Sequence, residues 1–320
     1  MRIARRRLHI TWQSIMPNAQ YYVCLITRNG AATIGATLDS IMRQTIPPAL
    51  VIIVDDGSTD KTPSIIRTRK ASEATALHMI RLADRGYDIR RVPENINRAY
   101  SYVDENNLSF QYSMISGDDC IYPSDYCEYL LSKLGSDSKL AVVSGDWGSH
   151  SSGMRKPPQG SGRFVRESFW NLVGRRYPVK YGWESWLIFK AQQLGFRVAN
   201  YTKLRYTHLR QIGSSHKFSH WGIEMRSLGY HPLLVLSRFG RNIILHNEPI
   251  TLVGNISMLA NYLLPQLYRD DPYFQYFDKD LRMFVRNHQA HRIVSTWDSH
   301  LARSFLFATA KLLGQLYKIS

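Results

Sequence analysis

The sequence has few cysteines and no long apolar run. Its three cysteines, Cys24, Cys120 and Cys127, show no Cys-x-x-Cys spacing, which argues against a zinc site or a disulfide framework and favours a reducing compartment. No run of about 18 apolar residues occurs, so no transmembrane helix is expected. The stretch after the basic opening 1–7 lacks the apolar length of a signal peptide. We therefore expect a cytoplasmic protein, either soluble or peripheral at the cytoplasmic face of a membrane.

Acidic residues are also scarce relative to basic ones. The 320 residues contain 41 Lys and Arg against 25 Asp and Glu, which gives a formal net charge of +16. Such an excess predicts an anionic partner, namely a nucleotide sugar, a lipid phosphate, an anionic membrane surface or a nucleic acid. A hydrophobic content of 44% over this length allows one large domain with an appendage.

Three apolar runs, at 22–26, 51–54 and 110–115, each end in polar residues. The first two are followed by segments with helical spacing of apolar residues, which predicts alternating strands and helices. The first turn lacks the G-x-G-x-x-G pattern, so a dinucleotide-binding fingerprint is absent. In open α/β sheets, ligands bind beyond the carboxyl ends of the strands, where the three polar clusters are expected to converge.

The adjacent carboxylates Asp118 and Asp119 follow the third apolar run. They repel each other and are costly to desolvate, so a cation or a hydroxyl donor at the strand end would explain them. Capping of the helix expected after Pro123 explains them equally well, since short acidic side chains are common at helix starts. Both interpretations remain open on the residues alone.

Four motifs together resemble those of the family 2 inverting glycosyltransferases of the GT-A fold. They are ITRN at 26–29, SIMRQT at 40–45, VDDGSTD at 54–60 and GDD at 117–119. The resemblance covers roughly residues 20–210. It implies a mixed, mainly parallel sheet flanked by helices, a nucleotide-diphosphate-sugar donor, a divalent cation (manganese or magnesium) and transfer with inversion.

The resemblance also implies roles for individual residues. Asp119 is expected to bind the metal, Asp118 to contact the ribose or the metal, and Asp56 to hydrogen-bond the base. Ser116 stands where many members carry another aspartate. The remaining residues expected to bind the nucleotide sugar are Thr27, Arg28, Asn29 and Asn97.

The downstream half contains a candidate base and two more candidate ligands. Glu184, between two tryptophans at the start of a predicted helix, resembles the acid that deprotonates the acceptor hydroxyl in this family, although Ser185 stands where aspartate is commoner. An acid at a helix N-terminus is also stabilised by the helix dipole in any protein. His208 is expected to complete the metal site and Arg210 to pair with the diphosphate, whereas an ordinary surface role is the alternative for each.

We expect a basic N-terminal arm over 1–19, a catalytic domain over 20–220 and a helical region over 221–320. The Gly/Ser/Pro-rich composition of segment 147–162 predicts a loop, and the resemblance to the GT-A fold implies that this loop lies near the acceptor. Segments 279–294 and 301–318 have basic amphipathic spacing, which suits a membrane surface, packing on the catalytic domain, or another subunit of a homo-oligomer.

The leading hypothesis is a metal-dependent inverting glycosyltransferase acting on a glycan or lipid-phosphate acceptor. A nucleotidyltransferase should show a Gly-rich phosphate loop, of which residues 28–31 are a poor version. A nucleic-acid-binding protein would explain the charge but would not require acidic pairs at two strand ends.

Overall fold

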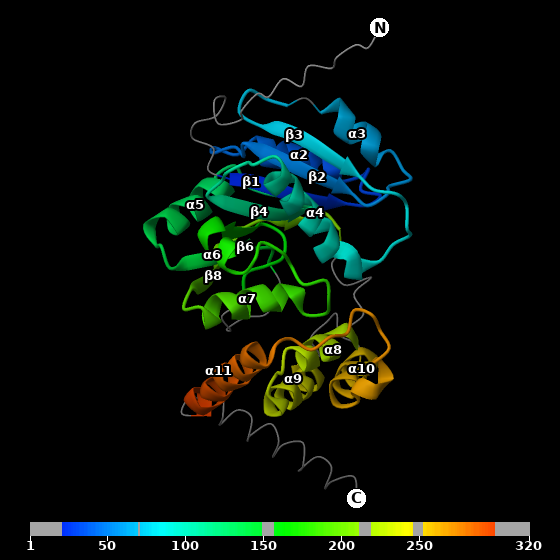
Figure 1. Cartoon of the computed structure of the whole chain (residues 1–320), viewed down its shortest axis with the longest axis vertical. Coiled ribbons are helices and arrows are strands. Elements are labelled where there is room, and N and C mark those ends of the chain that lie inside the picture. Colours follow the sequence, from blue (N-terminus) through cyan, green and yellow to red (C-terminus); the bar gives the residue numbers. More distant parts are fainter. Residues whose placement is uncertain (1–20, 70, 149–156, 211–218, 246–251, 298–320) are drawn as a thin grey trace, which may run out of the picture. The chain divides into compact units, whose positions relative to one another are not determined.

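The computed structural model describes residues 21–69, 71–148, 157–210, 219–245 and 252–297 (Figure 1). They form two compact units. The first holds the described residues up to 179 and from 183 to 210, and the second holds 180–182 and the described residues from 219 onward. The arm predicted over 1–19, residues 149–156 of the Gly/Ser/Pro-rich loop and the segment 301–318 lie outside the described residues.

The first unit is built on a seven-stranded sheet with the order β3-β2-β1-β4-β7-β6-β8. Strand β7 is antiparallel to β4 and β6, whereas the other pairs are parallel, so the predicted mixed, mainly parallel sheet is confirmed. The strands are β1 (Tyr21–Thr27), β2 (Leu50–Asp55), β3 (Ala76–Arg81), β4 (Tyr112–Gly117), β6 (Leu140–Asp146), β7 (Arg163–Arg166) and β8 (Arg197–Arg205). A second, two-stranded sheet pairs β5 (Cys120–Ile121) with β9 (Thr207–His208).

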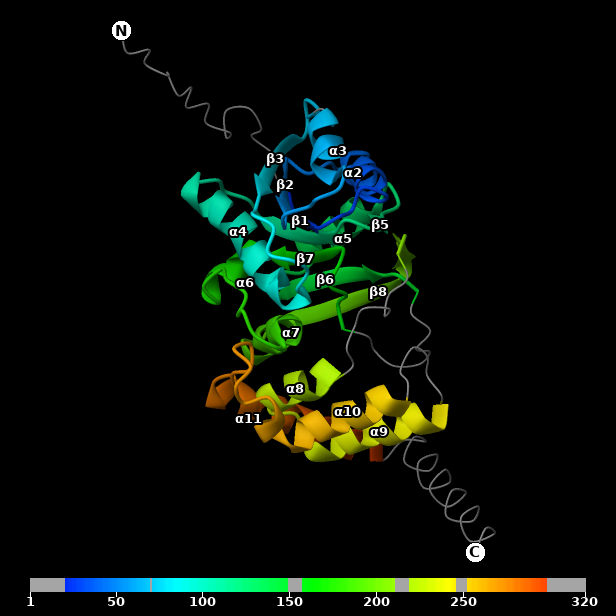
Figure 2. The same cartoon turned by 90° about the vertical axis from the view of Figure 1, so that its right-hand side faces the viewer.

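Helices cover both faces of the large sheet (Figure 2). Because side chains alternate along a strand, Tyr21, Val23 and Leu25 of β1 pack into one core layer with residues of α2 and α5. Tyr22 points to the other layer, where its ring lies 5.9 Å from that of Tyr100 in α4. The helices of this unit are α2 (Ile34–Met42), α3 (Thr62–Thr68), α4 (Val92–Glu105), α5 (Tyr126–Ser136), α6 (Glu167–Leu172) and α7 (Trp183–Gln193), with a 3-10 turn η1 at Ile89–Arg91.

The second unit is helical, as predicted for the C-terminal region. Its elements are α8 (Ser219–Ser227), α9 (Pro232–Leu245), α10 (Leu252–Leu263), a 3-10 turn η2 (Pro265–Leu267) and α11 (Lys279–Trp297). A small core forms around Met225, Val235, Met258 and Tyr262. None of the helices in the described part of the chain is both long and apolar enough to cross a membrane.

Candidate active site

The strand register brings the predicted polar clusters to one edge of the sheet. Thr27 at the end of β1 pairs with Asp55 of β2, and Ile26 pairs with Gly117 of β4. The three strands are parallel and adjacent, so their carboxyl ends open on the same side. Asp56 and Asp118 follow two of these ends directly, as expected from the sequence.

Asp118 is buried at the centre of this edge. Its residue is 5% exposed, and Thr27 Oγ1 donates to Asp118 Oδ2 at 2.5 Å. Arg210 donates to Asp118 Oδ1. A Cβ atom at Gly30 would lie 2.0 Å from Asp118 Oδ2, so only glycine allows the carboxylate to approach this turn. Sequence reasoning quoted Gly30 in the first turn but missed this requirement.

Asp119 lies beside His208 because Asp119 directly precedes β5, and Cys120 of β5 pairs with His208 of β9. His208 Nδ1 is 3.6 Å from Asp119 Oδ2, and Arg210 Nε is 3.5 Å from the same oxygen. The main chain fixes the pair further, since Leu209 N donates to Asp119 O at 2.7 Å. The ring of Trp147 stands edge-on to His208 with centroids 5.5 Å apart.

The buried thiol of Cys120 is the third group at this point. One ligand atom from each of Asp119, Cys120 and His208 lies within 4.8 Å of the others. Burial first, and then the charge of Asp119, raise the pKa of Cys120 to about 12, so the thiol is neutral at physiological pH. A carboxylate oxygen and an imidazole nitrogen suit manganese, and the carboxylate suits magnesium too, so Asp119 and His208 fit a divalent cation without the sulfur.

The capping alternative for the acidic pair is wrong. Helix α5 begins at Tyr126, and Asp125 occupies its N-cap position. Asp118 is instead held by Thr27 and Arg210. The Ser116 hydroxyl, at the position where many family members are expected to carry another aspartate, is buried, donates to Gly117 O at 2.7 Å and lies 2.9 Å from the Tyr122 hydroxyl.

Asp56 sits in a basic, buried corner beyond β2. It is 5% exposed, and its Oδ2 lies 3.4 Å from Nη2 of the buried Arg91. Asp56 Oδ1 is buried and accepts no hydrogen bond from the described residues, although Arg85 Nη2 lies 4.0 Å from it. A buried carboxylate oxygen normally has a partner, so this atom can accept a hydrogen bond from a ligand. Sequence reasoning missed Arg91.

The side chains of the other predicted nucleotide-binding residues make contacts within the protein. Arg28 donates to the main-chain oxygens of Asp56 and Gly57, the latter at 3.1 Å, and to Asp84 Oδ1 at 2.6 Å. Asn29 adopts a positive φ of 49°, and its Oδ1 accepts from Thr59 N at 2.9 Å. These contacts join the turn after β1 to the turn after β2, so the side chains of Arg28 and Asn29 stabilise the carboxyl edge of the sheet.

Asn97 lies on α4 and holds the main chain of Tyr177. Its Nδ2 donates to Tyr177 O at 2.8 Å, and its Oδ1 accepts from Tyr177 N at 2.8 Å. Both ends of the amide are therefore engaged. Asn97 thus fixes the main chain before α7, and the proposed nucleotide-sugar site does not include it.

Glu184 stands in the first turn of α7, as expected, with a side chain that is 49% exposed. Arg163 Nη2, on a side chain only 3% exposed, lies 3.6 Å from Glu184 Oε1. A Cβ atom at Gly160 would lie 2.5 Å from the same oxygen.

The segment 159–163 links this acid to the end of β4. Ser161 Oγ accepts from Gly117 N at 3.2 Å, within the same segment that contacts Glu184 through Gly160 and Arg163. Sequence reasoning missed Ser161 and Arg163, because they are separated from both partners along the chain.

Part of the chain is similar to curated relatives. The chain is 29% identical over 131 residues to PGL/p-HBAD biosynthesis glycosyltransferases of Mycobacterium bovis and Mycobacterium tuberculosis, covering 41% of this chain and 48% of each relative. The chain thus spans about half the length of the curated relatives it matches.

A solved structure shares the fold more widely. The mannosyltransferase PcManGT from Pyrobaculum calidifontis, in complex with GDP-Man and Mn²⁺, superposes with a TM-score of 0.52 at 18% identity, covering 92% of this chain and 80% of that one. At this identity the likeness establishes the GT-A fold. The model of a protein family described as glycosyl transferase family 2 matches residues 22–200, more than half of the sequence. The chain therefore belongs to glycosyl transferase family 2.

Proposed function

We propose that the protein moves a sugar from a nucleotide-diphosphate donor to an acceptor hydroxyl with inversion, and that it needs a divalent cation. The observation that carries the proposal is the meeting of Asp118, Asp119, His208 and Arg210 at the carboxyl end of β4. Family membership supports a nucleotide-linked donor, and so does Asp56 Oδ1 at the same edge, which accepts no hydrogen bond from the described residues.

Asp119 and His208 would hold the cation, manganese or magnesium. A bound divalent ion offsets the negative charge that collects on the departing nucleoside diphosphate. The Arg210 guanidinium forms ion pairs with Asp118 and Asp119, and its side chain is 47% exposed. Its planar guanidinium also suits a bidentate contact to a diphosphate, so we assign it to the donor.

Thr27 and Asp56 bind the donor nucleotide in this proposal. Thr27 orients Asp118 through its hydroxyl, and Asp118 is placed to contact the ribose or the cation. Asp56 accepts a hydrogen bond from the base at Oδ1, which accepts none from the described residues. Arg91 Nη2 lies 3.4 Å from the other oxygen of this carboxylate and helps to hold it in place.

Glu184 is the proposed base. The acceptor oxygen attacks the anomeric carbon, the bond from that carbon to the diphosphate oxygen breaks, and Glu184 takes the acceptor proton. One direct displacement inverts the anomeric centre. Arg163 and the segment 159–163 position Glu184 relative to the end of β4.

A donor screen tests the proposal. Purified full chain is incubated with UDP-, GDP- and dTDP-linked sugars, with manganese, magnesium or EDTA, and with glycan and lipid-phosphate acceptors. We expect one donor to be consumed with manganese or magnesium and not with EDTA, and the product's anomeric proton coupling to show inversion. Turnover unaffected by EDTA would remove the metal from the proposal, and retention of configuration would remove the Glu184 mechanism.

A further inference from the structure

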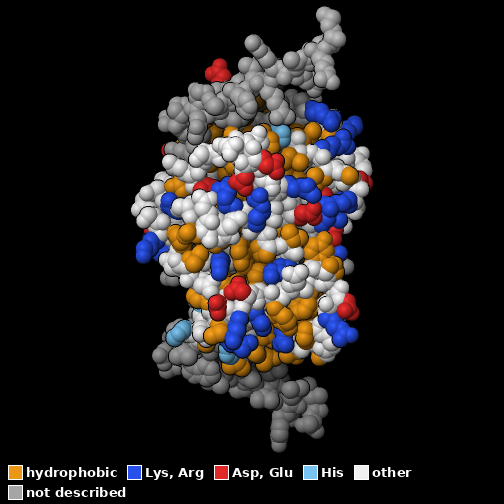
Figure 3. Space-filling model, viewed as in Figure 1, with side chains coloured by type: hydrophobic (Ala, Val, Ile, Leu, Met, Phe, Trp, Pro, Cys, Tyr) orange, Lys and Arg blue, Asp and Glu red, His pale blue; other side chains and the backbone are white. Residues whose placement is uncertain are grey.

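Aliphatic side chains are exposed along two neighbouring helices of the second unit. Helices α9 and α10 lie side by side (Figure 2). On α9, Leu233, Leu236 and Ile243 are exposed. Their spacing of i, i+3 and i+10 places them on one face of the helix. Figure 3 shows apolar side chains next to Lys and Arg side chains over the helices of this unit.

Helix α10 has a similar exposed face. Leu252, Val253, Ile256 and Leu263 are exposed, and Val253 is the most exposed of them, at 74%. Positions 252, 256 and 263 follow i, i+4 and i+11, so they share one side of the helix, with 253 beside them. Single apolar residues are normal on a protein surface, whereas a face of them along a helix indicates an interaction site.

Two amide side chains are buried between the same helices. Asn255 is 2% exposed, and its Oδ1 accepts from Nδ2 of the buried Asn242 at 3.1 Å. Asn255 Nδ2 donates to Phe239 O at 3.0 Å. A helix on the surface of a water-soluble domain normally directs its polar side chains to solvent. Here amide groups pair between the helices while Leu, Val and Ile remain outside, which suits an apolar environment on the outer side.

Basic residues accompany these faces, and acidic ones do not. The described residues of α9, α10 and η2 include Arg238 and Arg241 and no Asp or Glu. The Arg238 guanidinium lies over the ring of Trp221, 4.4 Å from its centroid. Tryptophan and arginine are both common at the level of lipid headgroups, where an apolar ring meets a polar surface.

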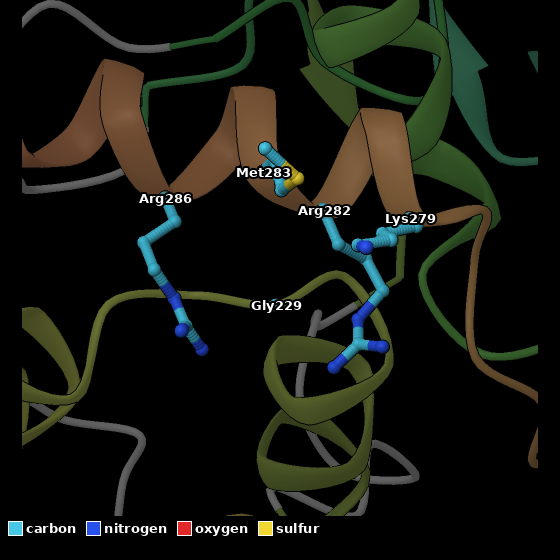
Figure 4. Close-up of a pocket in the computed structure, with 5 residues that line it drawn as sticks. All are labelled: Gly229, Lys279, Arg282, Met283 and Arg286. Atoms are coloured by element: carbon cyan, nitrogen blue, oxygen red, sulfur yellow. The ribbon is translucent and has the colours of Figure 1, made fainter.

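Helix α11 adds to the positive charge of the unit. Lys279, Arg282 and Arg286 share one face of this helix and extend from it near Gly229 (Figure 4). Across the described residues of the second unit, Lys and Arg outnumber Asp and Glu. Such an excess attracts an anionic surface within a Debye length, about 8 Å at physiological ionic strength.

We propose that the exposed faces of α9 and α10 contact an anionic lipid membrane. Leu, Ile and Val are among the side chains that enter hydrocarbon most favourably. Binding surfaces for proteins are enriched instead in aromatic residues and Arg, and their energetic hot spots rarely use Leu or Val. Helix α10 has 12 residues, and crossing a bilayer takes about 20, so this helix lies along the membrane surface. This inference does not rest on the proposed transfer reaction.

Vesicle sedimentation with the full chain tests the proposal. Vesicles of phosphatidylcholine with and without phosphatidylglycerol are used at low and at high salt. The paired variant Val253→Gln with Ile256→Gln removes two exposed aliphatic side chains from α10, and glutamine is a good helix former. The paired variant Leu233→Gln with Leu236→Gln makes the same change on α9.

The matched control changes two exposed leucines of the first unit. It is the paired variant Leu172→Gln with Leu194→Gln, and neither residue lies on the proposed faces. Melting temperatures equal to that of the wild type establish that all three paired variants are folded.

We expect the wild type and the control to bind vesicles that contain phosphatidylglycerol, within about twofold of each other, and each face variant to bind about tenfold or more weakly. Part of the wild-type binding should persist at high salt, because salt screens charges and leaves the apolar contact in place. Equally strong binding to phosphatidylcholine alone would overturn the preference for an anionic surface.

Three results would overturn the membrane contact itself. They are no binding of the wild type, equal binding of the wild type, the control and both face variants, and binding that disappears completely at high salt. Light scattering without vesicles tests a second copy of the chain as the occupant. A wild-type dimer that dissociates in the face variants, together with no vesicle binding, would make these faces an interface between copies.

Discussion

The hydroxyl of Thr27, the last residue of β1, donates a 2.5 Å hydrogen bond to Asp118, the first residue after β4. The two residues are 91 positions apart in the sequence. Their contact ties the turn at Gly30 to the acidic pair, so a change in this turn acts directly on the carboxylates.

Asp119→Asn should lower transfer by roughly 10²-fold or more, because it removes a charge that faces the proposed cation while keeping the shape of the side chain. Steady-state rates at several manganese concentrations measure the effect. Asp125→Asn is the control, since Asp125 is exposed and its side chain does not cap α5. Near wild-type turnover of Asp119→Asn, with the metal still required, would remove Asp119 from the site.

Glu184→Gln should reduce kcat by roughly 10²-fold or more and leave nucleotide affinity unchanged, because the amide cannot take the acceptor proton. Turnover and calorimetric binding of the nucleoside diphosphate are measured separately. Glu105→Gln, at the exposed end of α4, serves as the matched change. If donor affinity fell as much as the rate, Glu184 would have a structural role.

Gly30→Ala should impair donor binding and turnover while the chain still folds. The new Cβ would lie 2.0 Å from Asp118 Oδ2 and 2.7 Å from Thr27 Oγ1, so the two side chains must separate. A displacement of this size in a site can cost about 10²-fold in rate. Gly135→Ala is the control, because a Cβ at Gly135 meets nothing within 4 Å. Equal activity of the two variants would contradict the importance of the Thr27–Asp118 contact.

His78→Phe should make stability less sensitive to acid. Burial lowers the pKa of His78, whose ring stacks on Tyr102 with centroids 3.8 Å apart. The unfolded chain then binds the proton more readily, so stability is lost as pH falls through the unfolded value of about 6.5 towards the lower folded pKa. Phenylalanine keeps the stacking and cannot be protonated.

Melting temperatures at about pH 7.5 and about pH 5.5 check this prediction. We expect the wild type to lose more stability than His78→Phe over this interval. An equal or larger loss in His78→Phe would show that His78 does not contribute to acid sensitivity.

The sequence by itself determined the alternation of strands and helices and the residue types at the strand ends. A short apolar run bounded by polar residues, such as Leu50–Val54, is typical of a strand that is buried on both faces. The polar residues that follow the run are expected at the end of that strand. Parallel strands share their carboxyl edge, so Asp56 and Asp118 were predictable as neighbours of one site. The helical spacing of the C-terminal region was readable for the same reason.

Tertiary structure decided which side chains meet, because those contacts join distant segments. The pairing of β5 with β9 places His208 and Cys120 beside Asp119, and the segment 159–163 brings Arg163 to Glu184. The two hydrogen bonds between Asn97 and the main chain of Tyr177 likewise join residues 80 positions apart, so local sequence could not predict them. Local periodicity sets which face a residue occupies, whereas the partner on that face depends on how the whole chain folds back on itself.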